Sequence, residues 1–159
     1  MKKILIFGNS GSGKSTHAKK LAKQHQLAHL DLDTVAWQVT TPVARMPIEE
    51  SHRLLDSFTK ENDEWVIEGC YADLLALLTP QANEMVYLNL PVDDCVSNTK
   101  ARPWESHKYD SKEAQDANLP MLIDWITQYP LRDDTYSQRA HQQLFDGFTG
   151  DKKMMVSNG

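Results

Sequence analysis

A stretch near the start of the chain, residues 8–16 (GNSGSGKST), has the residue types and the spacing of a loop that holds phosphate groups. It satisfies the pattern G-x-x-x-x-G-K-[ST] from Gly8 to Ser15. Because glycine has no Cβ, Gly8, Gly11 and Gly13 let the backbone curl and direct successive N–H groups inward, where they bind an anion. A helix that begins after the loop would point the partly positive end of its dipole at the same place. The stretch therefore predicts a site for the phosphates of a nucleotide.

The chemistry of such a loop assigns a role to its polar side chains. Lys14 would reach the β- and γ-phosphates, the Ser15 hydroxyl would coordinate Mg²⁺, and Thr16 would hydrogen-bond the α-phosphate. ATP and Mg²⁺ are therefore the predicted cofactors. The residues predicted to bind the nucleotide are Gly8, Ser10, Gly11, Ser12, Gly13, Lys14, Ser15 and Thr16.

Three carboxylates follow apolar runs that are typical of strands. Asp31 and Asp33, in the sequence DLD, would share one face of a strand because side chains two residues apart point the same way. We expect Asp31 to order the waters of Mg²⁺ and Asp33 to accept a proton from a substrate hydroxyl. The alternative is that one aspartate only caps the following segment. Glu68, after the run WVI, is a further metal candidate, and its alternative is an orientation toward solvent.

Positive charge must offset the negative charge that develops when a phosphoryl group is transferred. Arg102, at the end of an expected helix, is the best candidate and is predicted to be catalytic. An isolated basic side chain is most often simply solvated, so the other candidates carry less weight. They are Lys108, Lys112, Arg132 and Arg139 on the side of a lid, and Arg45 and Arg53 on the side where an acceptor would bind. The histidines at positions 17, 25 and 29 lack the spacing of metal ligands.

Strand-like and helix-like segments alternate, which predicts an α/β protein with a parallel sheet covered on both faces. Strands are expected at 2–7, 27–33, 64–69, 84–90 and 152–157, and helices after the loop, from 47, at 72–78, at 93–102, from 118 and from 136. Residues 103–118 are polar without a sustained apolar period, so we expect a mobile surface segment there. Ligands of such sheets bind beyond the carboxyl ends of the strands, where the candidate glycines and carboxylates all fall.

The composition is that of an ordinary globular chain. Of 159 residues, 40% are hydrophobic and 25% are charged, which favours a single domain over residues 1–159. The net charge of −5 argues against direct nucleic-acid binding and against a cationic membrane surface. The apolar run near the N-terminus stops at Phe7, too short for a signal core, and no run reaches the ~20 residues of a membrane span. Cys70 and Cys95 are expected to be reduced thiols, and the predicted location is the cytoplasm.

These residues together resemble a known group of enzymes. The order of motifs is similar to that of nucleoside-monophosphate kinases. The phosphate loop comes first, followed by DLD on strand two, WVIEG on strand three and an arginine-bearing lid after strand four. That group includes the adenylate, shikimate and gluconate kinases. The sequence HLD followed by Trp37, and the segment WVIEGCY, also resemble small adenylate-kinase-like proteins of the DNA-topology-modulation type.

The resemblance implies a three-layer P-loop fold, with a five-stranded parallel sheet in the order 2-3-1-4-5 and a mobile lid that closes over ATP. It implies an acceptor-side insert at about 34–62 and a lid at about 102–118. By position, Asp31 and Asp33 match the D-x-D of shikimate kinases, whose second aspartate touches the acceptor, and Arg102 matches the lid-side arginine. The chain departs from the group in two places. Its EGCY lacks the proline and arginine with which adenylate kinases follow strand three, and Gly69 stands alone where shikimate kinases have a glycine triplet.

The predicted function is an ATP- and Mg²⁺-dependent kinase that acts on a small metabolite or a nucleoside monophosphate. Two alternatives belong to other classes. The first is a nucleotide-dependent regulatory or DNA-associated switch that turns over little metabolite. The second is a kinase that acts on nucleic-acid ends. A metabolite panel separates them, because only the first function predicts strong stimulation of ATP consumption by a small acceptor.

Overall fold

The computed structural model of the protein describes residues 1–38 and 43–159. Its centre is β1 (Lys3–Gly8), the apolar run that precedes the phosphate loop. Leu5 and Phe7 belong to the core on one face of the sheet, whereas Ile4 and Ile6 belong to the core on the other. The run is apolar throughout because this strand is buried on both faces.

Five parallel strands form the main sheet, in the order β2-β5-β1-β6-β7. The other four are β2 (Ala28–Asp31), β5 (Trp65–Gly69), β6 (Glu84–Leu88) and β7 (Asp151–Met155). Counted along the chain, the strands of this sheet lie in the order 2-3-1-4-5, so the predicted α/β topology is confirmed. The register sets Asp31 beside Glu68, and Phe7 beside Gly69.

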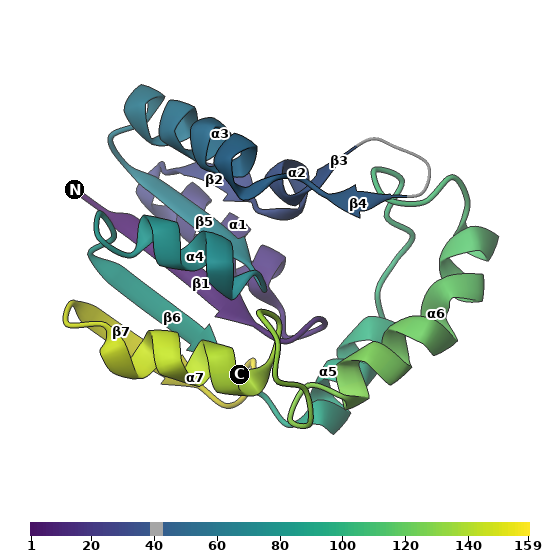
Figure 1. Ribbon diagram of the computed structural model, residues 1–159. Coiled ribbons are helices and arrows are strands. Elements are labelled where there is room, and N and C mark those ends of the chain that lie inside the picture. The colour runs from purple at the N-terminus through teal and green to yellow at the C-terminus, as the bar shows by residue number, and fades with distance from the viewer. Residues whose placement is uncertain (39–42) are drawn as a thin grey trace.

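Helices cover both faces of the sheet (Figure 1). The core around Leu5 and Phe7 is completed by α3 (Ile48–Glu61), α4 (Ala72–Leu78) and α7 (Gln138–Gly147). The core around Ile4 and Ile6 is completed by α1 (Lys14–His25), α5 (Val92–Lys100) and α6 (Lys112–Thr127). These two helical layers and the sheet between them are the three layers that were expected.

Two parts of the chain differ from the expectation. The helix α6 begins at Lys112, because the Ser111 hydroxyl accepts a hydrogen bond from the Ala114 N–H at 3.1 Å and caps its first turn. A helix start at Asn118 was therefore wrong, and the Asn118 amide instead donates to the Tyr109 hydroxyl at 2.8 Å. The polar segment after α5 is correspondingly shorter than predicted.

The second difference lies between β2 and α3. A one-turn helix, α2 (Asp33–Ala36), follows β2 directly and leads into a small antiparallel ribbon of β3 (Trp37–Gln38) and β4 (Ala44–Arg45). Residues 39–42 of the predicted acceptor-side insert lie outside the described residues. Asp33 therefore belongs to a helix and not to the strand that carries Asp31.

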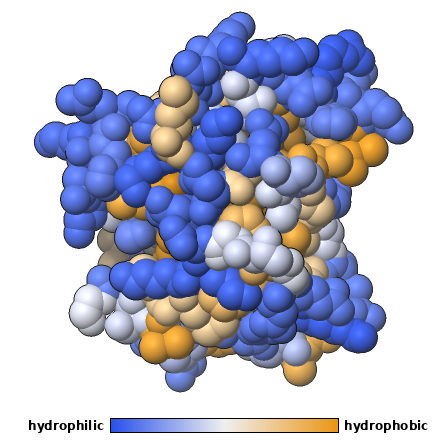
Figure 2. Space-filling view, turned by 90° about the vertical axis from the view of Figure 1, so that its left-hand side faces the viewer, coloured by the Kyte–Doolittle hydropathy of each residue, from blue (hydrophilic) through white to orange (hydrophobic). Residues whose placement is uncertain are grey.

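The candidate site lies on the side of the sheet where the strands end, opposite the side where they begin. The side on which the strands begin faces the viewer in Figure 2, where hydrophilic side chains cover most of the surface and hydrophobic ones form small separate groups. The phosphate loop and the candidate carboxylates lie at the other edge, where the strands end. In the described parts of the chain, none of the helices has both the length and the apolar character to cross a membrane.

Candidate active site

The phosphate loop joins the end of β1 to the start of α1 in a conformation that depends on glycine. Gly8, Gly11 and Gly13 all have positive φ, and that of Gly11 is 79°. A Cβ on Gly11 would lie 2.4 Å from the Cys95 carbonyl oxygen, because the loop packs directly against α5. The close approach and the positive φ together explain why glycine stands at this position.

Two asparagine side chains fix the outer side of this loop. The Asn98 amide donates to the Gly11 carbonyl at 2.9 Å and to the Asn158 side-chain oxygen at 2.8 Å. The Asn158 amide donates in turn to the Ser12 carbonyl at 3.0 Å. Sequence reasoning missed both residues, since they come from α5 and from the segment after β7 and belong to no motif.

Glu68 connects the loop to the strand beside it. The Ser15 hydroxyl donates to Glu68 Oε1 at 3.0 Å, and His29 Nε2 lies 2.8 Å from Glu68 Oε2. Only 2% of Glu68 is exposed, so the alternative orientation toward solvent was wrong. His29 was not expected to have a partner. Its place two residues before Asp31, on the strand paired with that of Glu68, puts all three side chains on one face.

Asp31 and Asp33 come together, although not along one strand. Asp31 is the last residue of β2 and Asp33 the first of α2, and the Asp33 N–H donates to Asp31 Oδ1 at 2.9 Å. Asp31 therefore does cap the following turn, which was the alternative interpretation, and both carboxylates also line the cleft described below. Burial raises the pKa of Asp31, and the negative charges of Asp33 and Glu68 raise it further.

Asp33 is held by an aromatic chain of hydrogen bonds. The Tyr71 hydroxyl donates to Asp33 Oδ1, and the Trp37 indole N–H donates to the Tyr71 oxygen at 2.8 Å. Burial, followed by the nearby negative charges, raises the pKa of Tyr71, so its hydroxyl stays protonated and remains a donor. The carboxylate of Asp33 is thereby fixed in orientation, which a residue that receives a substrate proton requires.

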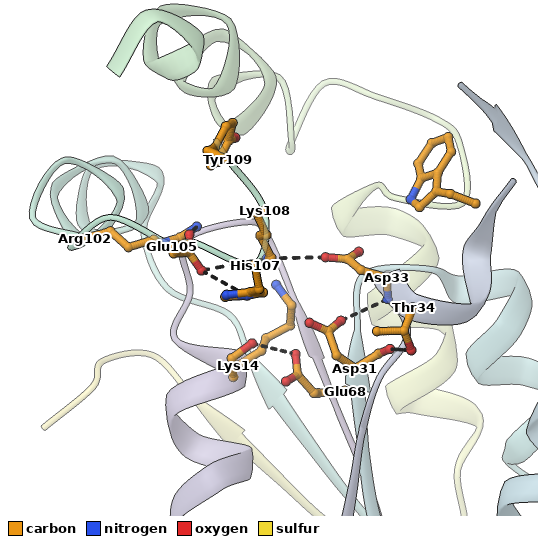
Figure 3. Close-up of polar contacts among 12 residues, drawn as sticks. Lys14, Asp31, Asp33, Thr34, Glu68, Arg102, Glu105, His107, Lys108 and Tyr109 are labelled. Carbon is orange, nitrogen blue, oxygen red and sulfur yellow. Dashed lines mark hydrogen bonds and ion pairs between the residues drawn. The ribbon is translucent and has the colours of Figure 1, made fainter. Parts of the chain in front are cut away.

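The segment between α5 and α6, residues 101–111, faces the phosphate loop across the cleft and is called the lid segment below. In Figure 3, Lys108 extends from it toward Asp33, and its Nζ lies 3.5 Å from Asp33 Oδ2. Arg102, His107 and Lys108 all lie within ion-pair distance of Glu105, at 3.2, 3.9 and 3.9 Å. Burial lowers the pKa of Lys108, but the carboxylates of Asp33 and Glu105 outweigh it and raise that pKa overall. Arg102 and Lys108, the two arginine and lysine side chains of the lid segment, therefore already have carboxylate partners.

Together these elements enclose a cleft of about 540 Å³. Its walls are the phosphate loop, the start of α1, the ends of β2 and β5, and the lid segment. A second cavity of about 500 Å³ adjoins the loop between α1, α5 and the segment after β7. It is lined by residues that include Gly11, Thr16, Asn98, Arg102 and Asn158. The two cavities meet at the phosphate loop, because Gly11, Gly13 and Thr16 line both of them.

Two arginines that we expected near an acceptor lie elsewhere. Arg45 donates to the Tyr136 hydroxyl at 2.8 Å and to Asp73 Oδ2 at 3.0 Å, and it does not line the cleft. Arg53 is exposed on α3 and does not line the cleft either. Arg45 joins α4 and the segment before α7 to the ribbon, so the structure brings neither of these two arginines to the cleft.

The basic residues beyond Lys108 also lie away from the cleft. Arg132 stacks on Trp125 at 3.6 Å from the ring centroid and pairs with Asp134, and the exposed Arg139 pairs with Asp133. Both follow α6, outside the lid segment. Lys112 pairs with Asp116 within α6. These pairings are local. The structure therefore places Arg132 and Arg139 away from the cleft, whereas Arg102 and Lys108 line it.

A magnesium site is testable against the residues present. Across residues 1–38 and 43–159, no three histidine, cysteine or acidic side chains are grouped as a metal centre made of protein alone would require. Mg²⁺ is usually held by one or two protein oxygens, nucleotide phosphates and waters. Ser15 at the start of α1, with the buried carboxylate of Glu68 behind it and Asp31 nearby, fits that kind of site.

The fold and the site define a P-loop protein with the kinase type of sheet, strand order and lid segment. The chain belongs to the AAA domain family AAA_18, whose model matches residues 4–118. Its structure is similar to shikimate kinase from Bacteroides thetaiotaomicron, with a TM-score of 0.50 and 17% identity over 91% of this chain and 97% of that one.

It is also similar to a sugar kinase from Janibacter sp. HTCC2649, with a TM-score of 0.51 and 14% identity over 82% of this chain and 97% of that one. No curated protein matches the chain. At these identities the likeness establishes the fold, which is that of the P-loop kinases of the shikimate and nucleoside-monophosphate kinase group.

Proposed function

We propose that the protein is an ATP-dependent kinase that transfers the γ-phosphoryl group to a hydroxyl of a small acceptor. One observation carries the proposal: a carboxylate, Asp33, is held by Tyr71 in the same cleft as the phosphate loop and Lys14. A site that only binds nucleotide has no need of a fixed base opposite the phosphates, whereas phosphoryl transfer needs a group that orients the attacking oxygen.

The nucleotide would bind through its phosphates to the loop, with its nucleoside end in the adjoining cavity. Lys14 Nζ donates to the Asn9 carbonyl at 2.8 Å, so its ammonium group lies against the phosphate loop. Ser15, supported by Glu68, would hold Mg²⁺, and Asp31 would order its waters. Magnesium, when bound, supplies neutralisation of the charge on the β- and γ-phosphates.

In the transfer step, Asp33 accepts the proton of the acceptor hydroxyl. The acceptor oxygen forms a bond to the γ-phosphorus while the bond from that phosphorus to the bridging oxygen breaks, and ADP leaves with the electron pair. Lys14 and Arg102 stabilise the charge on the transferred group. The cleft contributes mainly by position, since it holds both reactants in one orientation.

We further propose that the whole chain, residues 1–159, works as one kinase domain, with the lid segment closing over ATP and an acceptor-side insert at about 34–62. We still predict that the protein is cytoplasmic and that it binds neither nucleic acid nor a membrane. Both cysteines are free thiols, which supports a reducing compartment.

The test is the variant Lys14→Ala, assayed with labelled ATP and a panel of small hydroxyl compounds. Phosphoryl transfer should fall by at least about 100-fold because one fixed positive charge on the transition state is lost. Lys23→Ala is the matched control, since Lys23 is exposed on the same helix away from the loop. Circular dichroism checks that both variants are folded. Turnover that survives in folded Lys14→Ala would refute the proposal.

A further inference from the structure

We infer that the acceptor is a hydroxyl compound without a negatively charged group, such as a polyol or an amino alcohol. The inference rests on the proposed function and concerns the acceptor side of the cleft. It depends on which charges line that side and on which of them are already paired.

The strand ends give this side a negative character. Asp31 at the end of β2, Asp33 at the start of α2 and Glu68 in β5 all line the cleft. An acceptor hydroxyl must come within hydrogen-bond distance of Asp33 to lose its proton. Because the proposed function assigns Asp31 and Glu68 to Mg²⁺, a carboxylate or phosphate on a small acceptor would need a cation of its own on this side of the cleft.

The segment that forms the acceptor side adds no cation to the cleft. Asp33 precedes the acceptor-side insert, and among the described residues of that insert, 34–38 and 43–62, none lines the cleft. The remaining residues of that segment, 39–42, are Val-Thr-Thr-Pro and carry no charge in the sequence. Lys14 and Lys19 come from α1, the helix that starts at the phosphate loop.

This segment contains two arginines, of which Arg53 is exposed on α3, and Arg45 already uses each of its three nitrogens in a hydrogen bond. Its Nη1 donates to the Tyr136 hydroxyl, its Nη2 to Asp73, and its Nε to the Ala36 carbonyl at 3.2 Å. Its guanidinium lies 5.0 Å from the centre of the Tyr71 ring and 5.9 Å from that of Trp37. Arg45 therefore supports the aromatic chain that fixes Asp33 and is a positioning residue.

The lid segment offers cations that are already matched. Lys108, the cation nearest to Asp33, lies between Asp33 and Glu105, and Arg102 also pairs with Glu105. Recognition of a carboxylate or phosphate normally uses an arginine fork that faces the ligand. Hydroxyl and ammonium groups, by contrast, donate hydrogen bonds to carboxylates, which is what this side of the cleft provides.

The experiment uses the wild-type protein, labelled ATP with Mg²⁺, and a small-molecule extract that ion exchange has separated into anionic, neutral and cationic fractions. We expect phosphorylated product from the neutral or the cationic fraction and none from the anionic one. Single compounds refine the comparison: glucose, glucosamine, gluconate and glucose 6-phosphate share a skeleton and differ in charge. AMP and shikimate are titrated calorimetrically with a non-hydrolysable ATP analogue present, and we expect no binding at millimolar levels.

The outcomes separate the two claims. Product from the anionic fraction alone, or saturable binding of AMP or shikimate beside the analogue, would overturn this inference and leave the kinase function intact. If no fraction gives product although the protein binds MgATP, the proposed function falls and this inference falls with it. Arg45→Gln gives a further readout: a positioning role lowers kcat for an uncharged acceptor, whereas a raised KM at unchanged kcat would mean direct contact with the acceptor and contradict the inference.

Discussion

The buried carboxylate of Glu68 receives hydrogen bonds from the loop and from the neighbouring strand, and Glu68→Gln removes its charge while keeping its size. In the wild type, the Ser15 hydroxyl and His29 contact its two oxygens at 3.0 and 2.8 Å. Because Glu68 is 2% exposed, water cannot replace either partner without a rearrangement of the chain. The variant therefore tests whether the negative charge behind Ser15 contributes to the binding of Mg²⁺.

The expected loss follows from the two contacts. A hydrogen bond to a charged group is worth about 1.5–3 kcal/mol and one between neutral groups about 0.5–1.5 kcal/mol. Neutral glutamine thus weakens each contact by about 1 kcal/mol, and two contacts give about 2 kcal/mol. If that energy helps to hold Ser15 in the orientation that binds the metal, the affinity for MgATP falls by about 10- to 30-fold.

The assay is a pair of calorimetric titrations, one with ATP and Mg²⁺ and one with ATP and a chelator. Glu68→Gln should lose affinity in the first and stay within about twofold of the wild type in the second. Glu61→Gln, at the exposed end of α3, is the matched control and should match the wild type in both. Equal losses in the two titrations would show that Glu68 acts on the loop alone, and no loss in either would refute the reasoning.

Three other variants test the fold that supports the site. Burial lowers the pKa of His141 to about 4, whereas a histidine in the unfolded chain has a pKa of about 6.5. As the pH falls below about 6.5, the unfolded state therefore binds a proton that the folded state does not. The free energy of unfolding then falls by about 1.4 kcal/mol per pH unit. His141→Gln should remove this slope in urea denaturation between pH about 7 and 5. Gly11→Ala should weaken ATP binding at least about tenfold, because its methyl group would lie 2.4 Å from a carbonyl oxygen and residue 11 has a positive φ. The control Gly147→Ala, whose methyl group would have no neighbour within 4 Å, should bind ATP as the wild type does. Arg45→Lys should lower the free energy of unfolding by about 1–3 kcal/mol, because hydrogen bonds of the guanidinium are lost. The control Arg53→Lys, at an exposed position, should lower it by less than about 0.5 kcal/mol. An unchanged free energy of unfolding for Arg45→Lys would show that the contacts of Arg45 are not maintained in solution.

The sheet and the phosphate loop were predictable because each depends on local signals. A strand buried on both faces must be apolar throughout, and a loop with three positive φ values must contain glycine, so β1 and the loop are readable residue by residue. The convergence of Asp31 and Glu68 followed from topology, since the carboxyl ends of neighbouring parallel strands lie at one edge.

The remaining parts of the site depend on partners that are distant in sequence. Arg45 looked like a free cation, but its partners Asp73 and Tyr136 are 28 and 91 residues away. Asn158 reaches the loop from 146 residues away. Asp33 was expected beside Asp31 on one face of a strand. It does lie beside Asp31, but the turn after β2 brings it there.

The geometry of the proposed reaction depends on one short segment, the end of β5 and the turn that follows it. Glu68, bonded to Ser15, would support the metal side of the cleft, and Tyr71, three residues later, would support the proposed base Asp33. Between them the Cys70 carbonyl accepts a hydrogen bond from His141 Nε2 at 2.8 Å. A carbonyl can only accept, and a histidine with so low a pKa is neutral, so Nδ1 must accept from the Tyr129 hydroxyl at 2.6 Å. A buried polar chain of fixed direction therefore anchors this segment from the core, and in the proposed reaction the fold would set the spacing between phosphate and acceptor.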